Sequence, residues 1–399
     1  MKRVLIVINS LWNGGAERSL VNLLNEMDPK RYSVDLLMLL PEGIFISQIP
    51  NWVHILETPY VIRDLYGSKG KYKRNLYNKF IRYYGTLVSR IYCDHKNKSE
   101  AFRWKHFYKK RIKYIDGIYD LAVAYVSGDP MFLISDRVHA KKKVLWVHND
   151  YRTARFPKKY DIEHYEKMEV IISISDKCVE ILKEEFPKLA DRIHMIPNIT
   201  SSRVVKNRAN ENFPPEFIGK SNIIVSVGRL WCEQKGFDIA VDAANELKKR
   251  NIEFTWFVLG DGRDYDKLIT QIKRHRLEKE FILLGIRVNP YVYIKHCTIL
   301  AQTSRFEGKS VVLDEAKILA IPILSTNYPT VYDQIIDGKE GMIVDMTPVG
   351  IADGLEKMLT DTEYRNKINS YLSQHEYGNQ ELVDKYYTLF DNLMYSYER

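Results

Sequence analysis

Residues 222–250 read NIIVSVGRLWCEQKGFDIAVDAANELKKR. The run Ile223–Val227 is almost entirely aliphatic, which is typical of a strand buried on both faces of a parallel sheet. A turn at Gly228 follows, and from Gly236 to Arg250 the apolar residues recur with the spacing of an amphipathic helix. A strand, a glycine turn and a helix in this order form the repeating unit of α/β proteins. The sequence therefore predicts an α/β fold with a parallel sheet.

The same unit repeats on both sides of this stretch, in two groups. Residues 200–220 separate the groups, because they contain paired serines and paired prolines but no periodic apolar stripe, as a linker does. We therefore predict two Rossmann-like domains, over 1–200 and 201–378. An apolar face predicts a helix within 379–399 that packs back on the N-terminal domain. Apolar runs predict strands at 4–8, 32–40, 120–126, 143–147 and 170–174, and at 222–227, 254–259, 281–284, 297–301 and 322–325.

The composition excludes several classes of protein. The chain has 399 residues, 45% hydrophobic and 28% charged, which is typical of a globular protein with packed cores. Its four cysteines are too far apart in the sequence for a zinc site or a disulfide framework, so a reducing compartment is expected. The apolar run at residues 4–8 is shorter than a signal-peptide core, and no run approaches the ~18 residues of a spanning helix. A secreted binding protein and an integral membrane protein are both disfavoured.

Residues 63–113 form a strongly basic segment on an otherwise slightly acidic chain. They hold sixteen Lys and Arg against three acidic residues, while the whole chain has a formal charge of +9. The segment also holds eleven aromatic residues, and this combination favours either an anionic bilayer surface or nucleic acid. A solvated helical pair whose aromatics pack on the domain explains the same pattern. We favour the bilayer and expect no nucleic-acid partner.

Two cations and two carboxylates follow the strands of the C-terminal domain. Arg229 and Lys235 stand in the loop after its first strand, where they can converge on one anion, Arg with a bidentate fork. Glu307 stands at the mouth of a predicted helix and Glu315 about two turns along, near the same face. Cations beside carboxylates suit a ligand that carries both phosphates and hydroxyls. Two solvated cations in a loop are the alternative for Arg229 and Lys235.

Gly14 and Gly15 lie between the first strand and the first helix of the N-terminal domain. Glycines at this place let backbone amides approach an anion at the positive end of a helix. The chain has neither a dinucleotide-binding fingerprint nor a lysine-bearing phosphate loop, so a structural turn explains the two glycines equally well.

Two further motifs match functional signatures and are better explained structurally. Asp264-Tyr265-Asp266 has the Asp-x-Asp spacing of a metal site, yet it opens a predicted helix, where acidic residues cap amides and favour the dipole. We therefore expect no metal there. Asn198-Ile199-Thr200 matches a glycosylation acceptor, but no secretory signal supports it.

Five motifs in this order resemble the retaining glycosyltransferases of family 4, which have the GT-B fold, two Rossmann-like domains with the active site in the interdomain cleft. The resemblance covers nearly the whole chain and is strongest over residues 170–360. The chain departs from the family pattern at the pair Lys309-Ser310 and at Asp314, and both changes bear on which sugar is accepted. The motifs are Gly14-Gly15, Ser173-Ile174-Ser175 with Ile196-Pro197-Asn198, Gly228-Arg229 with Lys235-Gly236, Leu259-Gly260-Asp261-Gly262, and Glu307 with Glu315.

The resemblance implies a role for each of these residues. Arg229 and Lys235 would hold the donor diphosphate, Glu315 the ribose hydroxyls and Glu307 the transferred sugar. After the strand at 143–147, His148 would face the donor sugar, with a structural histidine as the alternative, and Asp150 would contact the acceptor. The implied catalytic residues are His148, Arg229, Lys235 and Glu307; the implied donor-binding residues are Gly14, Gly15, Gly262, Gly308, Lys309, Ser310 and Glu315.

The activity implied by this resemblance is metal-independent, retaining transfer without a cofactor. A hexose or N-acetylhexosamine would move from a nucleoside-diphosphate sugar, UDP-linked, to a glycan or lipid-linked acceptor in bacterial polysaccharide or cell-surface glycan synthesis. The protein would be cytoplasmic and peripherally associated with the inner face of the membrane. The alternatives are a sugar-nucleotide epimerase or hydrolase on the same fold and a non-catalytic sugar-nucleotide-binding protein.

Overall fold

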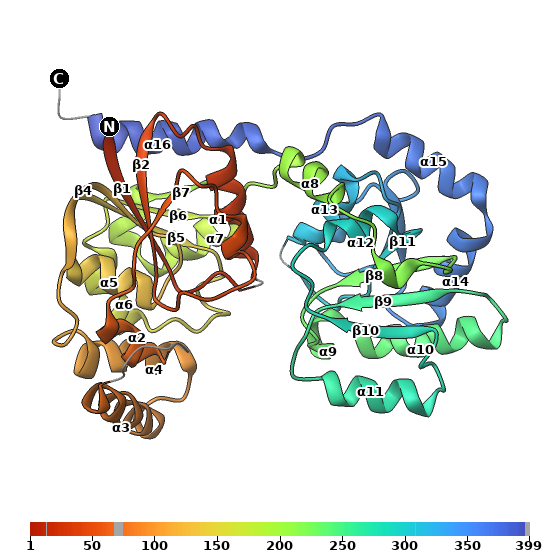
Figure 1. Ribbon diagram of the computed structural model, residues 1–399, viewed down its shortest axis with the longest axis horizontal. Helices are drawn as coiled ribbons and strands as arrows, with labels where there is room; N and C mark the ends of the chain where they lie inside the picture. Colours follow the sequence, from red (N-terminus) through yellow and green to blue (C-terminus); the bar gives the residue numbers. More distant parts are fainter. Residues whose placement is uncertain (13, 68–74, 308, 396–399) are drawn as a thin grey trace. The chain divides into compact units, whose positions relative to one another are not determined.

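The computed structural model describes residues 1–12, 14–67, 75–307 and 309–395. The chain folds into two compact units (Figure 1). Unit 1 comprises Met1–Ile199 and Gln380–Arg399, and unit 2 comprises Thr200–Asn379. Residues 68–74 of the basic segment, Gly308 of the implied site and residues 396–399 of the predicted C-terminal helix lie outside the described residues.

Unit 1 is built on a seven-stranded sheet in the order β3-β2-β1-β4-β5-β6-β7, with every neighbouring pair parallel. Its strands are β1 Lys2–Ile8, β2 Tyr32–Met38, β3 His54–Ile55, β4 Ile115–Ala124, β5 Val138–Val147, β6 Val170–Ser173 and β7 Ile193–Met195. Its helices are α1 Gly15–Glu26, α2 Tyr60–Tyr66, α3 Leu76–Tyr92, α4 Lys96–Arg103, α5 Asp129–Arg137, α6 Lys158–Tyr165, α7 Asp176–Glu185 and α16 Val383–Tyr395.

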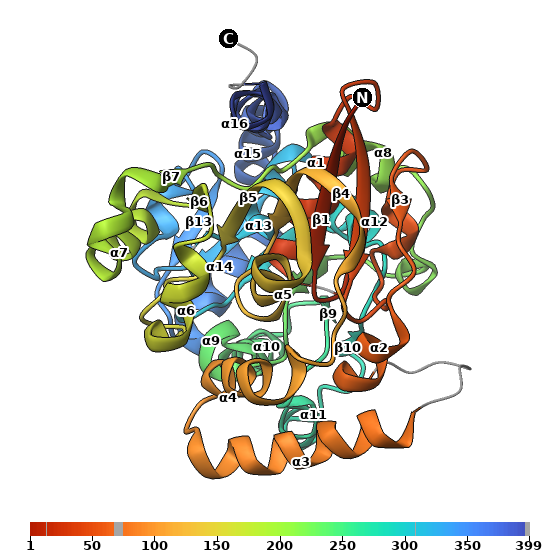
Figure 2. The same cartoon turned by 90° about the vertical axis from the view of Figure 1, so that its left-hand side faces the viewer.

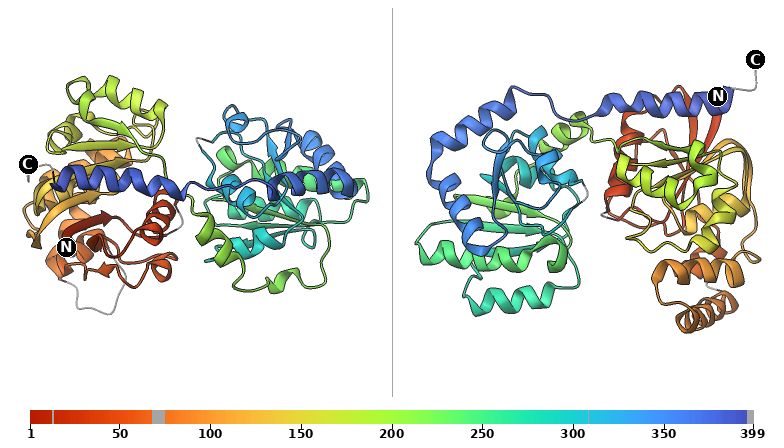
Figure 3. Two further views of the ribbon diagram at one scale, coloured as in Figure 1. Left: turned by 90° about the horizontal axis from the view of Figure 1, so that it is seen from above. Right: turned by 180° about the vertical axis from the view of Figure 1, so that it is seen from behind.

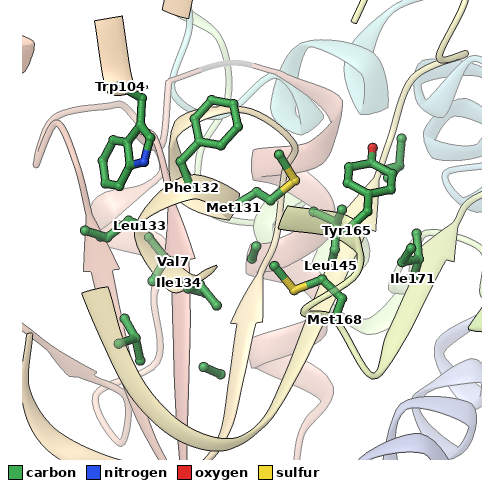
Figure 4. Close-up of a cluster of buried hydrophobic side chains, with 14 of the residues drawn as sticks. Val7, Trp104, Met131, Phe132, Leu133, Ile134, Leu145, Tyr165, Met168 and Ile171 are labelled. Atoms are coloured by element: carbon green, nitrogen blue, oxygen red, sulfur yellow. The ribbon is translucent and has the colours of Figure 1, made fainter. Parts of the chain in front are cut away.

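Alternate residues of the strands of unit 1 enter two apolar layers, one on each face of the sheet. In β1, Leu5 and Val7 belong to the layer under α5, where Phe132 stacks on Trp104 at a centroid distance of 6.0 Å (Figure 4). Residues on the opposite face of β1 join the layer formed by α1 and α16. There α16, the last helix of the chain, lies along unit 1 (Figure 3, right) and stacks Tyr386 on Trp146 at 5.4 Å.

Unit 2 contains a six-stranded parallel sheet in the order β10-β9-β8-β11-β12-β13. Its α10, α11 and α14 share one apolar layer, and α12 and α13 share the other. Its strands are β8 Ile223–Val227, β9 Thr255–Leu259, β10 Phe281–Gly285, β11 Ile299–Gln302, β12 Ile323–Thr326 and β13 Gly341–Val344. Its helices are α8 Ser202–Ala209, α9 Cys232–Lys235, α10 Phe237–Lys249, α11 Tyr265–Arg274, α12 Tyr291–His296, α13 Val311–Ile318, α14 Pro348–Thr360 and α15 Thr362–Ser373.

The predicted fold class is confirmed, since both units are Rossmann-like with parallel sheets. The prediction of an irregular linker over 200–220 is wrong, because this stretch contains α8. The Ser201 hydroxyl caps α8 by accepting a hydrogen bond from the Val204 amide at 3.0 Å. Only Val205 and Ala209 of this helix are buried, and two apolar positions are too few to produce a detectable periodicity. Among the described residues, no helix combines the length and apolar character needed to cross a membrane.

Asp161 is a buried carboxyl group in unit 1. It accepts a hydrogen bond from the Tyr151 hydroxyl at 2.8 Å. Burial raises the pKa of Asp161 to about 7, although the bond from Tyr151 acts in the opposite direction. Folded unit 1 therefore holds a proton on Asp161 that the unfolded chain releases near pH 4, so this residue removes stability as the pH rises from about 4 to about 7.

We predict that Asp161→Asn removes this pH dependence, because the amide is neutral at every pH. The melting temperature of the variant should match that of the wild type near pH 4 and exceed it by several degrees at pH 8, as scanning calorimetry can measure. Asp120→Asn is the control, since Lys141 and the Arg3 amide offset burial and lower the pKa of Asp120, so this variant should lose stability at neutral pH. Parallel melting profiles for Asp161→Asn and the wild type would contradict the assignment.

Candidate active site

The predicted residues of unit 2 lie in the loops that follow β8, β9 and β11, at the carboxyl edge of the sheet. The strand order reverses between β8 and β11, since the chain proceeds from β8 to β9 and β10 on one side and from β11 to β12 and β13 on the other. Open α/β sheets bind ligands outside the carboxyl ends of their strands at such a switch point. The topology therefore places the predicted cations and Glu307 where a ligand site is expected.

Lys235 and Glu307 form an ion pair at this edge. The Lys235 ammonium lies 2.5 Å from Oε1 of Glu307, and the Ser304 hydroxyl donates to the same oxygen at 2.6 Å. Both side chains are largely buried, with 17% of Lys235 and 8% of Glu307 exposed. The two residues, 72 positions apart, were predicted to bind different parts of a ligand, and the structure joins them directly.

Arg229 follows Gly228 at the end of β8 and is exposed to solvent. The hydrocarbon chain of Lys235 crosses the neighbouring Gly228, at 3.3 Å from the position a Cβ atom would take there. Arg229 forms no ion pair with any residue that the structure describes, so its guanidinium is available to an anion at the carboxyl end of β8.

The loop after β11 is held against α9 and α10 by Arg305, a residue that was not among the predicted site residues. Arg305 forms a bidentate ion pair with Asp238, at 2.7 and 2.9 Å, and its amide donates to the Gln234 carbonyl at 2.7 Å. Burial raises the pKa of Asp238, but Arg305 and two backbone amides together offset this, and the pKa of Asp238 is below its usual range. Arg305 lies two residues before Glu307 in the sequence. Its partner Asp238 is 67 positions away, and no local sequence pattern indicates such a pairing.

Two glycines of the quoted motifs have structural explanations. Gly236 has a φ of +63°, and a Cβ atom there would lie 2.0 Å from the Thr303 carbonyl oxygen. A Cβ atom on Gly262 would lie 2.6 Å from the Leu230 carbonyl oxygen, and Leu230 donates its amide to the Asp261 carbonyl at 3.1 Å. Gly262 therefore lets the loops after β8 and β9 pack closely.

Asp264 caps a helix, as its acidic character predicted, but the helix is a different one. Its carboxylate accepts a hydrogen bond from the Cys232 amide, at the start of α9, at 2.7 Å. It makes no side-chain capping bond to α11, which it precedes. The described residues contain no group of three or more His, Cys, Asp or Glu side chains placed to hold a metal ion.

The residues predicted around α13 differ in accessibility. Lys309 is exposed and pairs with Asp314 at 3.3 Å. Ser310 points inward instead, because its hydroxyl donates to Gln302 at 2.6 Å and its amide donates to Gln334 at 2.8 Å. Glu315 has no exposed surface, so a ribose hydroxyl reaches its carboxylate only after the residues that cover it have moved. Gly308 lies outside the described residues.

Gly14 and Gly15 stand at the N-terminus of α1, after β1. Gly14 is the N-cap residue of this helix, and Gly15 is exposed, with no atom within 4 Å of where its Cβ atom would be. The Glu17 carboxylate folds over Gly14, 2.0 Å from that residue's Cβ position. An anion approaching the helix N-terminus therefore meets an open backbone at Gly15 and a carboxylate at Gly14.

His148 and Asp150 follow β5, at the same carboxyl edge of unit 1. The His148 ring is 5.1 Å from the ring of Tyr125, and its nitrogens are shielded from solvent. The Tyr125 backbone and the Asn198 side chain favour its charged form. Burial lowers the pKa of His148 to about 4, so the imidazole is neutral at pH 7. Asp150 caps its own turn by accepting from the amides of Arg152 and Thr153, at 2.9 and 3.1 Å.

Two Rossmann-like units with candidate residues at the carboxyl edges of their sheets define the GT-B class of fold. The solved structure of TarM from S. aureus in complex with fondaparinux, alpha-GlcNAc-glycerol and UDP superposes with a TM-score of 0.63. The alignment covers 98% of this chain and all of that one at 15% identity, so it shows the fold.

The comparison with family models matches part of the chain. Residues 207–375 match the family described as Glycosyl transferases group 1. This match covers most of unit 2 and includes Arg229, Lys235, Glu307 and Glu315. Over this range, unit 2 is therefore similar to the domain that this family model describes.

Two relatives with similar sequences are each 25% identical to this chain, one over about half of its length and one over almost all of it. An uncharacterized glycosyltransferase of Methanocaldococcus jannaschii is 25% identical over 199 residues, so the match spans about half of each chain, 47% of this one and 49% of the relative. N-acetylgalactosamine-N,N'-diacetylbacillosaminyl-diphospho-undecaprenol 4-alpha-N-acetylgalactosaminyltransferase of Campylobacter jejuni is 25% identical over 377 residues, which is 92% of this chain and 94% of that one.

Proposed function

We propose that this protein is a retaining glycosyltransferase that moves a hexose or N-acetylhexosamine from a nucleoside-diphosphate sugar to a glycan or lipid-linked acceptor. One observation carries the proposal. The Lys235–Glu307 pair and the solvent-exposed Arg229 stand in loops at the strand-order switch of unit 2, within the range that matches the Glycosyl transferases group 1 model. Cations that can bind a diphosphate thus stand next to a carboxylate that can bind sugar hydroxyls.

In the proposed reaction, the acceptor replaces the diphosphate at the anomeric carbon of the donor sugar. The new bond forms on the face of the sugar that the diphosphate leaves, so the anomeric configuration is retained. The bond from this carbon to the diphosphate oxygen breaks, and a bond to the acceptor hydroxyl oxygen forms. The hydroxyl proton passes to the departing diphosphate, so no side chain needs to act as a general base. Arg229 and Lys235 would stabilise the negative charge that develops on the leaving group, which is preorganised electrostatic catalysis.

The other residues would bind and orient the substrates. Glu307 would accept hydrogen bonds from the sugar while it stays paired with Lys235, and Glu315 would accept them from the ribose. The neutral His148 would offer a hydrogen bond without a charge, and Asp150 would contact the acceptor through the oxygen not occupied by its turn. We propose that Gly15, Gly262 and Lys309 complete the donor site, with Gly14 and Ser310 holding the backbone in place.

The relatives support the choice of substrates. The Campylobacter enzyme is named for an undecaprenol diphosphate acceptor, and the TarM structure was solved in complex with UDP. We therefore propose a UDP-linked donor, no cofactor, and action at the cytoplasmic face of a membrane to which the protein binds peripherally.

Two measurements test this function. A thermal-shift screen of nucleotide sugars identifies the donor, because a ligand at 100 times its dissociation constant adds ~2.7 kcal/mol of stability. Turnover of that donor is then followed with and without a lipid-linked acceptor. Transfer requires both substrates, whereas an epimerase or hydrolase consumes the donor alone and a binding protein consumes nothing.

We predict that activity survives chelation by EDTA with less than about a twofold change, because Arg229 and Lys235 provide the positive charge that a metal supplies in other enzymes. Asp264, the first acid of the metal-like motif, is occupied by the Cys232 amide. Activity is measured on chelated and dialysed protein, with and without added manganese or magnesium. A loss that either ion restores would show that the reaction needs a metal.

A further inference from the structure

Helix α3 of unit 1 turns its largest apolar side chains outward. Leu76, Phe80, Tyr83, Leu87 and Ile91 are each between 59% and 79% exposed. Their spacing of three or four residues places all five on one stripe of the helix. Soluble proteins rarely expose a continuous apolar stripe of this kind, and a stripe rimmed by polar residues marks an interaction surface.

The opposite face of α3 contacts the rest of unit 1 through small and polar residues. Asn78, Gly85 and Ser89 are the buried residues of this helix. The ring of Phe107 lies 3.2 Å from the Cβ position of Gly85, and the Asn78 amide donates to Asp64 at 3.1 Å. The helix is thus attached to the unit by this face together with the partly buried Ile81, so the fold leaves the five residues of the stripe uncovered. Figure 2 shows α3 as the outer helix of this part of unit 1, beyond α4.

The positive charge around the apolar stripe indicates that its partner carries negative charge. Residues 76–92 contain no Asp or Glu, and the segment 63–113 to which they belong has sixteen basic residues against three acidic ones. A second copy of this chain would bring the same positive charge against it and be repelled. The cations of this segment that form no ion pair with a described residue include Lys79, Arg82, Arg90, Lys105, Lys110, Arg111 and Lys113.

We propose that α3 is an interfacial helix that lies in the plane of an anionic phospholipid bilayer, with the stripe from Leu76 to Ile91 among the acyl chains. This inference rests on the proposed membrane attachment and names the element that makes it. Tyr83, at the centre of the stripe, has an apolar ring and a polar hydroxyl, which suits the headgroup boundary. The surrounding cations contact anionic headgroups, so attachment combines a salt-sensitive electrostatic part with a salt-resistant apolar part.

The test compares apolar and charged variants by co-sedimentation with vesicles. Leu87→Gln/Ile91→Gln should weaken binding to phosphatidylglycerol-containing vesicles about 100-fold, because two large apolar side chains no longer enter the bilayer. Lys79→Gln/Arg90→Gln should weaken it about tenfold at ~0.05 M salt and little at ~0.5 M salt. The matched control is Ile118→Gln/Ile218→Gln, which removes two equally exposed residues, at 70% and 72%, that lie outside α3.

Four results would overturn the proposal. They are absence of wild-type binding to anionic vesicles, equal binding to pure phosphatidylcholine, an equal loss in the control variant, and unchanged binding of Leu87→Gln/Ile91→Gln. Sedimentation velocity tests the alternative that a second copy of this chain covers the stripe. A wild-type dimer that becomes monomeric in Leu87→Gln/Ile91→Gln would assign the stripe to a second copy.

The thermal shift with nucleotide sugar is measured on the same proteins. It should not change in the α3 variants, so a failure of donor binding would count against the proposed function and not against the interfacial helix.

Discussion

Replacing Lys235 with alanine is expected to lower turnover of the nucleotide-sugar donor ~10²–10³-fold, and Arg229→Ala is expected to do the same. Each substitution removes one cation from the place where the leaving diphosphate gains charge. Lys235 is the more constrained of the two, because it is largely buried against Glu307. Arg229 reaches the same edge from solvent, so its loss should not affect the stability of unit 2. Loss of Lys235 leaves the buried Glu307 without its partner, so this variant should also be less stable.

The matched control for these two variants is Lys220→Ala. Lys220 is also exposed, but it precedes β8 where Arg229 follows it, so its loss should leave turnover unchanged. Initial rates at saturating donor and the thermal unfolding of each variant separate catalysis from stability. If Arg229→Ala and Lys235→Ala both kept more than about a tenth of wild-type turnover while folded, the assignment of a phosphate clamp would be wrong.

The second large effect concerns the two carboxylates. Glu315→Gln is expected to weaken binding of the free nucleoside diphosphate about tenfold or more, because a buried carboxylate accepts strong hydrogen bonds from ribose hydroxyls. Glu307→Gln should leave that binding nearly unchanged and lower turnover of the sugar donor ~10²-fold, since its carboxylate would act on the transferred sugar. Glutamine keeps the shape of each side chain and removes only its charge.

Calorimetric titration with the nucleoside diphosphate and initial rates with the nucleotide sugar distinguish the two variants. Asp266→Asn is the control. Asp266 is an exposed residue in the first turn of α11, and it has no predicted role in ligand binding. Equal losses of diphosphate affinity in Glu307→Gln and Glu315→Gln would refute the division between ribose and sugar.

The features of the fold that could be predicted are those with strong local signals. The aliphatic run Ile223–Val227 forms β8, as expected of a strand covered on both faces. Helix α8 was missed, because its stability comes from packing of Val205 and Ala209 against Tyr291 and Ile318 and not from its own pattern. The outward face of α3 was not predictable either, since periodicity locates an apolar stripe but not the side of the protein on which it lies.

Some residues of the candidate site could likewise be selected from local sequence signals, and others could not. Residue types and strand ends were sufficient to select Arg229, Lys235 and Glu307, because strand carboxyl ends converge at one edge of a parallel sheet. The pairing of Arg305 with Asp238 depends on how two loops meet in space, which sequence spacing does not encode. The inward turn of Ser310 depends likewise on Gln302 and Gln334.

The most direct test of the account is the anomeric configuration of the product, measured by proton NMR during the first turnovers with an α-linked UDP-sugar and a lipid-linked acceptor. We expect an α-linked glycoside that forms together with UDP, only when acceptor is present and not with Lys235→Ala. A β-linked product, release of UDP at the same rate without acceptor, or a rearranged sugar still joined to UDP would contradict retaining transfer by this protein.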